Sequence, residues 1–166
     1  MRRVVSVLAA VVFLTVGFVP AASADMSVYY LFHNANSTYC MSAKGGVMAN
    51  GTKVIQWPCN KTAKDQQWYS DAGQLKNRKD PSFCLSSPNN WTSPGVQLTI
   101  WKCQGATGQR WVRTTSAEGY PLIYNVASGR IAAVGGASLT AGAAVVQWDW
   151  ELKAEQVWYA ERFFSV

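Results

Sequence analysis

Hydrophobic positions along this chain occur in short stretches, which are separated by clusters of Gly, Pro, Asn, Asp and Ser. Short apolar or alternating runs bounded by such turn residues are typical of β-strands, whereas a helix needs a longer stripe with a period near 3.6. The pattern carries no such stripe, and residues 151–157 allow at most one helical turn. It predicts an all-β protein whose strands include residues 27–32, 53–57, 66–70, 97–101, 110–114, 144–148 and 156–161.

The strand pattern repeats along the chain. The triplet Gln-x-Trp occurs three times, and its tryptophans, which are 43 and 47 residues apart, are Trp68, Trp111 and Trp158. An apolar run that ends in tryptophan precedes each triplet, and each of these tryptophans follows a glycine by six residues. The second series consists of Trp57, Trp101 and Trp148. Markers that keep one register indicate three tandem repeats, at about 27–70, 71–114 and 118–162.

The number of repeats decides between two architectures. A period of 43 to 47 residues also suits a propeller blade, but a propeller needs about four blades or more to close. Three repeats that fill the patterned part of the chain imply a closed threefold structure. The sequence therefore predicts a β-trefoil.

The first 24 residues have a different character. Arg2 and Arg3 precede an apolar run from Val4 to Val19, and the segment ends in Ala22-Ser23-Ala24. This order is typical of a secretory signal peptide, and no second apolar segment follows that could anchor the chain in a membrane. We expect residues 25–166 to form one exported, extracellular domain with no membrane association.

All four cysteines lie after residue 24, and an even number in an exported protein favours disulfides. Cys40 and Cys59 are 19 residues apart, as are Cys84 and Cys103, and each pair brackets the same part of its repeat. Four cysteines allow three connectivities, and the repeat register selects these two bridges. At the matching positions the third repeat has the apolar pair Ile131 and Trp150.

Composition and charge narrow the function classes. Without the two leader arginines, the chain has 13 Lys and Arg against 9 Asp and Glu, and these charges are scattered, so no nucleic-acid partner is expected. The cysteine spacings and the single histidine, His33, argue against a metal site, and the carboxylates fall at unmatched repeat positions. We therefore expect neither enzymatic activity nor a cofactor.

The three Gln-x-Trp triplets, the cysteine spacing and the Gly-x5-Trp-x-Cys pattern together resemble the ricin B-type lectin domain, across essentially all of residues 25–166. The resemblance implies a β-trefoil that binds sugars, with the Gln-x-Trp tryptophans in its core. In members that bind galactose, an aromatic ring stacks on the sugar while an Asp, an Asn and a Gln hold its hydroxyl groups.

Only part of that sugar-binding set is present here. The aromatic positions are Trp57, Trp101 and Trp148, and the glutamines are Gln66, Gln109 and Gln156. The Asp positions have become Ser42, Ser86 and Ala133, and the Asn positions have become Asp65, Gly108 and Glu155. Losing a carboxylate that accepts two sugar hydroxyls leaves polar groups of the ligand unpaired, which puts the standard galactose site in doubt.

The candidate carbohydrate-binding residues are therefore the three aromatics, the three glutamines, and the nearby polar residues Asp65, Asn89 and Asp149. The three aromatic positions remain open between a sugar platform and ordinary packing. The expected structural core consists of Trp68, Trp111, Trp158, Ile131 and Trp150.

The leading hypothesis is a monomeric lectin-like module that binds a glycan or polysaccharide. The alternative is a trefoil that has lost sugar binding and binds a protein partner, as an inhibitor or a toxin-associated scaffold.

Overall fold

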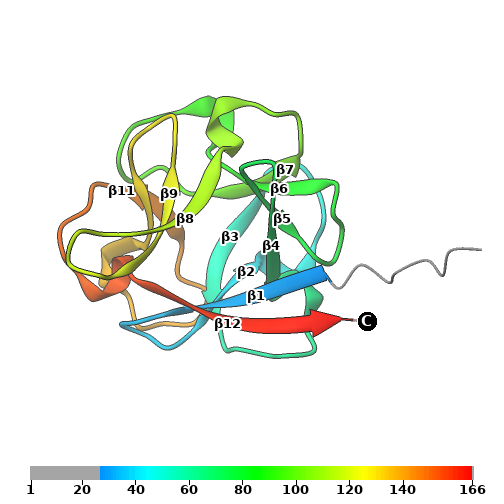
Figure 1. The fold of residues 1–166 in the computed structure, drawn as a ribbon, viewed down its shortest axis with the longest axis horizontal. Coiled ribbons are helices and arrows are strands. Elements are labelled where there is room, and N and C mark those ends of the chain that lie inside the picture. The colour runs from blue at the N-terminus through cyan, green and yellow to red at the C-terminus, as the bar shows by residue number, and fades with distance from the viewer. Residues whose placement is uncertain (1–26, 166) are drawn as a thin grey trace, which may run out of the picture.

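The structure is a computed structural model, and it describes residues 27–165. Its strands are grouped four to a repeat (Figure 1). The strands are β1 (Ser27–Asn34), β2 (Cys40–Ala43), β3 (Thr52–Trp57), β4 (Gln67–Asp71), β5 (Gln74–Asn77), β6 (Phe83–Ser86), β7 (Thr99–Lys102), β8 (Trp111–Thr115), β9 (Pro121–Asn125), β10 (Ile131–Val134), β11 (Val145–Trp148) and β12 (Trp158–Ser165). The leader proposed for residues 1–24 lies outside the described residues.

Six short 3₁₀ turns complete the architecture, two to a repeat. The turns are η1 (Lys44–Gly46), η2 (Lys64–Gln66), η3 (Pro88–Asn90), η4 (Thr107–Gln109), η5 (Gly135–Ala137) and η6 (Ala154–Gln156). The single helical turn allowed at 151–157 is η6. No helix of residues 27–165 is long and apolar enough to cross a membrane.

The middle two strands of each repeat form a hairpin: β2 with β3, β6 with β7 and β10 with β11. The outer strands pair around a barrel, where β1 contacts both β4 and β12. Single bridges, Ile55 with Ala144 and Gln97 with Val146, join the hairpins to one another. A barrel together with three hairpins is the β-trefoil fold that the repeats predict.

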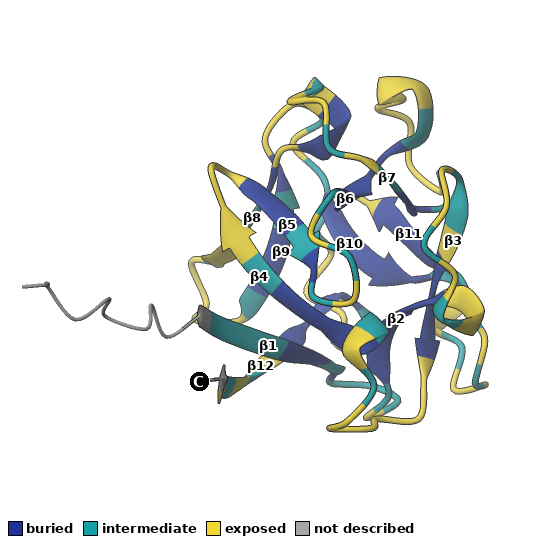
Figure 2. Ribbon diagram, turned by 90° about the vertical axis from the view of Figure 1, so that its right-hand side faces the viewer, coloured by how far each residue is buried: buried dark blue, intermediate teal, exposed yellow. Residues whose placement is uncertain are grey.

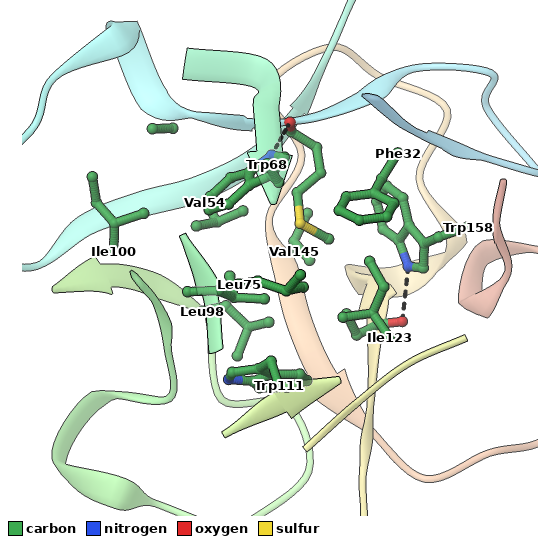
Figure 3. Close-up of a cluster of buried hydrophobic side chains, with 14 of the residues drawn as sticks. Phe32, Val54, Trp68, Leu75, Leu98, Ile100, Trp111, Ile123, Val145 and Trp158 are labelled. Carbon is green, nitrogen blue, oxygen red and sulfur yellow. Dashed lines mark hydrogen bonds between the residues drawn. The ribbon is translucent and has the colours of Figure 1, made fainter. Parts of the chain in front are cut away.

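The core lies in the interior of the domain, where the buried parts of the strands face one another (Figure 2). Trp68, Trp111 and Trp158 are almost completely buried, with Leu75 and Leu98 packed among them (Figure 3). Each indole Nε1 donates to a backbone carbonyl: Met41 O at 3.1 Å, Gly108 O at 2.9 Å and Ala132 O at 2.9 Å. Burying a Trp without losing its polar group requires such an acceptor.

The structure has both expected disulfides, Cys40–Cys59 and Cys84–Cys103. In each bridge the first cysteine is fully buried and the second lies nearer the surface. The third repeat follows the same rule, because Ile131 is buried and Trp150 is half-buried beside Tyr120. The expectation that Trp150 belongs to the core is therefore wrong, because its position is at the rim of the trefoil.

Candidate functional site

Three hollows occupy equivalent places in the three repeats, one at the end of each hairpin. Each hollow is lined by a residue from the end of the hairpin's first strand (Ser42, Ser86 or Ala133), by a tryptophan from the end of its second strand, and by the Gln of the next Gln-x-Trp triplet. The tryptophans are Trp57, Trp101 and Trp148. In each hairpin this tryptophan pairs with the residue at the first-cysteine position: Cys40, Cys84 or Ile131.

The floor of each hollow is a 3₁₀ turn whose middle residue has a left-handed backbone. These residues are Gly45 (φ 63°), Asn89 (φ 53°) and Gly136 (φ 62°). Gly and Asn are the residues that adopt this conformation at least cost. The tight turn draws the chain back beneath the tryptophan and leaves a concave surface.

The three glutamines brace a loop from inside. Gln66 accepts from Asn60 N at 2.8 Å and donates to Pro58 O at 3.0 Å. Gln109 in the same way accepts from Gln104 N and donates to Lys102 O. Gln156 accepts from Glu151 N and donates to Asp149 O. All three are buried. Because each amide already pairs with backbone groups, the side chains that face a ligand are the tryptophan and its polar neighbours.

The first hollow is the largest, with a volume of about 950 Å³. Trp57 is 47% exposed there, so one face of its ring is open. Across from it, Ser42 Oγ donates a hydrogen bond to Asp65 Oδ2 at 2.9 Å. The first hollow thus has a carboxylate at position 65, next to position 42, and the hydroxyl group of Ser42 holds it in place.

The second hollow is small, about 230 Å³, and its tryptophan, Trp101, is half-buried. Asn90 takes up the space beside Gly108, where a side chain at position 108 would lie. Its Oδ1 accepts a hydrogen bond from Gly108 N at 2.8 Å. Asn89 lines the same hollow, and no charged side chain does so. The side chain of Asn90 thus stands where a ligand's polar groups would be received.

The third hollow, of about 390 Å³, is open beside Trp148, which is 39% exposed. Its acidic residues are Glu151 and Glu155, and Glu151 Oε1 accepts from Trp148 Nε1 at 3.1 Å. Asp149, a sugar-binding candidate from the sequence, is not among its lining residues, and its Oδ1 faces Arg130 Nε at 3.0 Å. Asp149 therefore points away from this hollow, since side chains next to each other near a strand end point in different directions.

Each hollow is completed by a neighbouring repeat, a feature that sequence reasoning missed. A Cβ at Gly142 would lie 3.7 Å from the Trp57 ring, and Gly51 and Gly95 stand in the same relation to Trp101 and Trp148, at 3.7 and 3.3 Å. The glycine six residues before each tryptophan thus supports the platform of a different repeat. Glycine is favoured at these positions because all three have a left-handed backbone, with φ of 83° at Gly51, 81° at Gly95 and 88° at Gly142.

Two buried glutamines hold those supporting loops in place. Gln56 Nε2 donates to Ser138 O at 2.8 Å and Thr140 O at 2.9 Å, and Gln147 Nε2 donates to Trp91 O and Ser93 O. The sequence does contain a signal for these two glutamines: each is a polar residue inside an apolar run, directly before the tryptophan, in two of the three repeats.

The geometry can be compared with known proteins. A model of the ricin-type β-trefoil lectin domain matches residues 28–158. The chain belongs to this family. The expected fold and the expected family resemblance are both confirmed.

Solved structures share the architecture of this ricin-type domain. The designed 3-fold symmetric protein ThreeFoil is 25% identical, with a TM-score of 0.73 over 80% of this chain and 96% of its own. The C-half of the earthworm R-type lectin, in complex with GalNAc, is 18% identical, with a TM-score of 0.69 over 82% and 99%. The exo-β-1,3-galactanase 1,3Gal43A from Clostridium thermocellum is 24% identical, with a TM-score of 0.73 over 86% of this chain but 31% of its own.

The filled second hollow of this ricin-type domain leads to a stability prediction. A Cβ at Gly108 would lie 2.8 Å from Ser87 O and 2.9 Å from Asn90 Oδ1, so Gly108→Ala should lower the free energy of unfolding by about 1 to 3 kcal/mol. Urea unfolding measures this change. The control is Gly135→Ala, whose Cβ meets its nearest neighbours at 3.5 Å; equal effects of the two changes would contradict the filled hollow.

One close group of His and Cys side chains in residues 27–165 could be mistaken for a metal centre: His33, Cys40 and Cys59. Both sulfur atoms belong to a disulfide, and His33 Nδ1 lies 3.4 Å from the nearer one. A metal ligand must be a thiolate, so this group in its oxidised form offers only the imidazole.

Proposed function

We propose that this ricin-type domain is an exported lectin without catalytic activity that binds a glycan in its first hollow. The observation that supports it best is the pairing of an open Trp57 face with a carboxylate, Asp65, held by Ser42. The ring can stack on the apolar face of a sugar and so recognise its shape. The carboxylate can accept hydrogen bonds from the sugar's hydroxyl groups and so fix its orientation.

Family membership and the relatives support a glycan partner. An earthworm lectin of this fold was solved with GalNAc and a mutant of it with 6'-sialyllactose. Export rests on the leader-like residues 1–24, and the two disulfides suit an oxidising compartment. The domain would span residues 25–166 and act as a monomer.

The proposal is tested by binding of the purified protein to a glycan array and to insoluble polysaccharides. Trp57→Ala should weaken binding by about 30-fold, because an aromatic anchor contributes about 2 kcal/mol or more. The matched control is Trp91→Ala, which removes a 56% exposed tryptophan that lines none of the three hollows. Equal effects of the two variants would contradict a site at Trp57.

A second pair of variants tests the carboxylate. Asp65→Asn should weaken binding about tenfold, because a charged acceptor is lost. Combining it with Ser42→Asp returns the carboxylate to the wall where galactose-binding relatives have it, and binding should recover. If Asp65→Asn has no effect, the carboxylate does not contact the ligand.

The alternative, a trefoil that binds a protein, predicts hollows filled by side chains. The second hollow comes nearest to that description, since it is the smallest of the three and Asn90 narrows it, whereas Trp57 and Trp148 are more exposed. Absence of binding to any glycan would favour this alternative.

A further inference from the structure

The three hollows differ in charge, although their backbones are equivalent. The first is lined by Lys44, Lys61, Lys79 and one carboxylate, Asp65. The second has no charged lining residue. The third is lined by Glu151, Glu155 and a single lysine, Lys153. The formal charge of the lining is thus +2, 0 and −1 in the three repeats, and only the first hollow is positive.

One of the three lysines is neutralised. Lys61 forms an ion pair with Glu161, and this contact, with a smaller one from His33, lowers the pKa of the Glu161 carboxyl. The ammonium group of Lys61 is therefore already matched by a negative charge at the edge of the hollow.

The other two ammonium groups have no such partner. Neither Lys44 nor Lys79 takes part in the ion pairs found among residues 27–165. Lys79 is nonetheless held in place, because its Nζ donates to Gly46 O at 2.7 Å. A backbone acceptor positions the ammonium group without cancelling its charge, so the group can still attract an anion.

Lys79 also lies beside the carboxylate. A Cβ at Gly46 would be 3.0 Å from Lys79 Nζ and 3.5 Å from Asp65 Oδ1, so the two groups flank the same point on the turn. A ligand on Trp57 would therefore meet a hydroxyl acceptor and a cation at adjacent places. The absence of a side chain at Gly46 keeps this junction open.

We propose that the first hollow selects an anionic glycan, one whose sugar carries a carboxylate or a sulfate group. The sugar ring stacks on Trp57, its hydroxyl groups donate to Asp65, and its anionic group lies against Lys79 and Lys44. Both lysines line the same hollow, and charges in one hollow are weakly screened at 0.1 M salt, where the Debye length is about 10 Å. The inference rests on the proposed function, since it specifies the ligand of the same site.

The test compares polysaccharides that differ only in their charge. Polygalacturonate and its fully methyl-esterified form probe the carboxylate, and carrageenan and its desulfated form probe the sulfate. The wild-type protein should bind the charged member of one pair more tightly, and added salt should weaken that binding. The double variant Lys44→Gln/Lys79→Gln should weaken binding of the charged member about tenfold and remove the preference for it over the neutral member. The control is Lys53→Gln, an exposed lysine outside the hollows.

Each outcome separates the inference from the function on which it rests. A preference for the charged member that the double variant removes supports the inference, and the pair that shows it identifies the anionic group. Equal binding of both members, with loss in Trp57→Ala, overturns the inference but retains the lectin. Binding of charged polymers that Trp57→Ala does not weaken overturns it too, because the attraction then lies elsewhere. If neither the array nor any polysaccharide binds, both proposals fail.

Discussion

Replacing Trp68 with alanine is expected to lower the free energy of unfolding by about 3 to 5 kcal/mol. The ring is fully buried in the core, where the surrounding strands pair with one another and cannot collapse into the space that it leaves. The change also removes the hydrogen bond from its Nε1 to Met41 O. Urea unfolding followed by circular dichroism measures the loss.

Trp91→Ala is the control, because this ring is exposed and its loss should change stability by no more than about 0.5 kcal/mol. Trp111→Ala and Trp158→Ala should each cost about as much as Trp68→Ala, since all three rings are almost completely buried in the same core cluster. A loss below about 1 kcal/mol for any of the three would show that the core does not depend equally on its three repeats.

Removing either disulfide is expected to lower the free energy of unfolding by about 3 kcal/mol, the chain-entropy cost of freeing a loop of this length. The two bridges should differ in their effect on binding. Cys59 lines the first hollow, so Cys40→Ala/Cys59→Ala should loosen that site and weaken glycan binding. Cys84→Ala/Cys103→Ala should reduce stability to the same extent and leave binding in the first hollow unchanged.

Both double variants should still fold, because the third repeat has Ile131 and Trp150 where the others have a bridge. Urea unfolding and glycan binding, measured on the same samples, separate the two effects. Equal loss of binding in both variants would mean that the bridges act through overall stability and that the first one has no local role.

The fold was predictable because its signals are local and repeated three times. The spacing of Trp68, Trp111 and Trp158 fixed the repeat, and the cysteine register fixed the bridges. The glycine before each hairpin tryptophan was equally visible. Its role was not, because it supports a ring in another repeat, and a contact between repeats leaves no mark in the spacing within one.

The site was less predictable, because it depends on the direction of individual side chains. The absence of Asp at position 42 was visible in the sequence. The hydrogen bond from Ser42 to Asp65 was not, because it depends on the directions of two side chains that are far apart in the sequence. Asn90 lines the second hollow and accepts from Gly108 N, a contact that no spacing in the sequence predicts. Asp149 faces Arg130 and does not line the third hollow, because a residue next to a hairpin tryptophan need not share its direction.

The pairing of β1 with β12 affects how this domain can be built into larger assemblies. Ser27 pairs with Ser165 at one end of these strands and Asn34 pairs with Trp158 at the other, so the two ends of the described chain emerge side by side (Figure 1). A short linker between them would close the backbone into a ring, which makes the domain suited to circular permutation. Fusion partners attached to either end would leave from the same point, so both orders of fusion would present the three hollows to solvent in the same orientation.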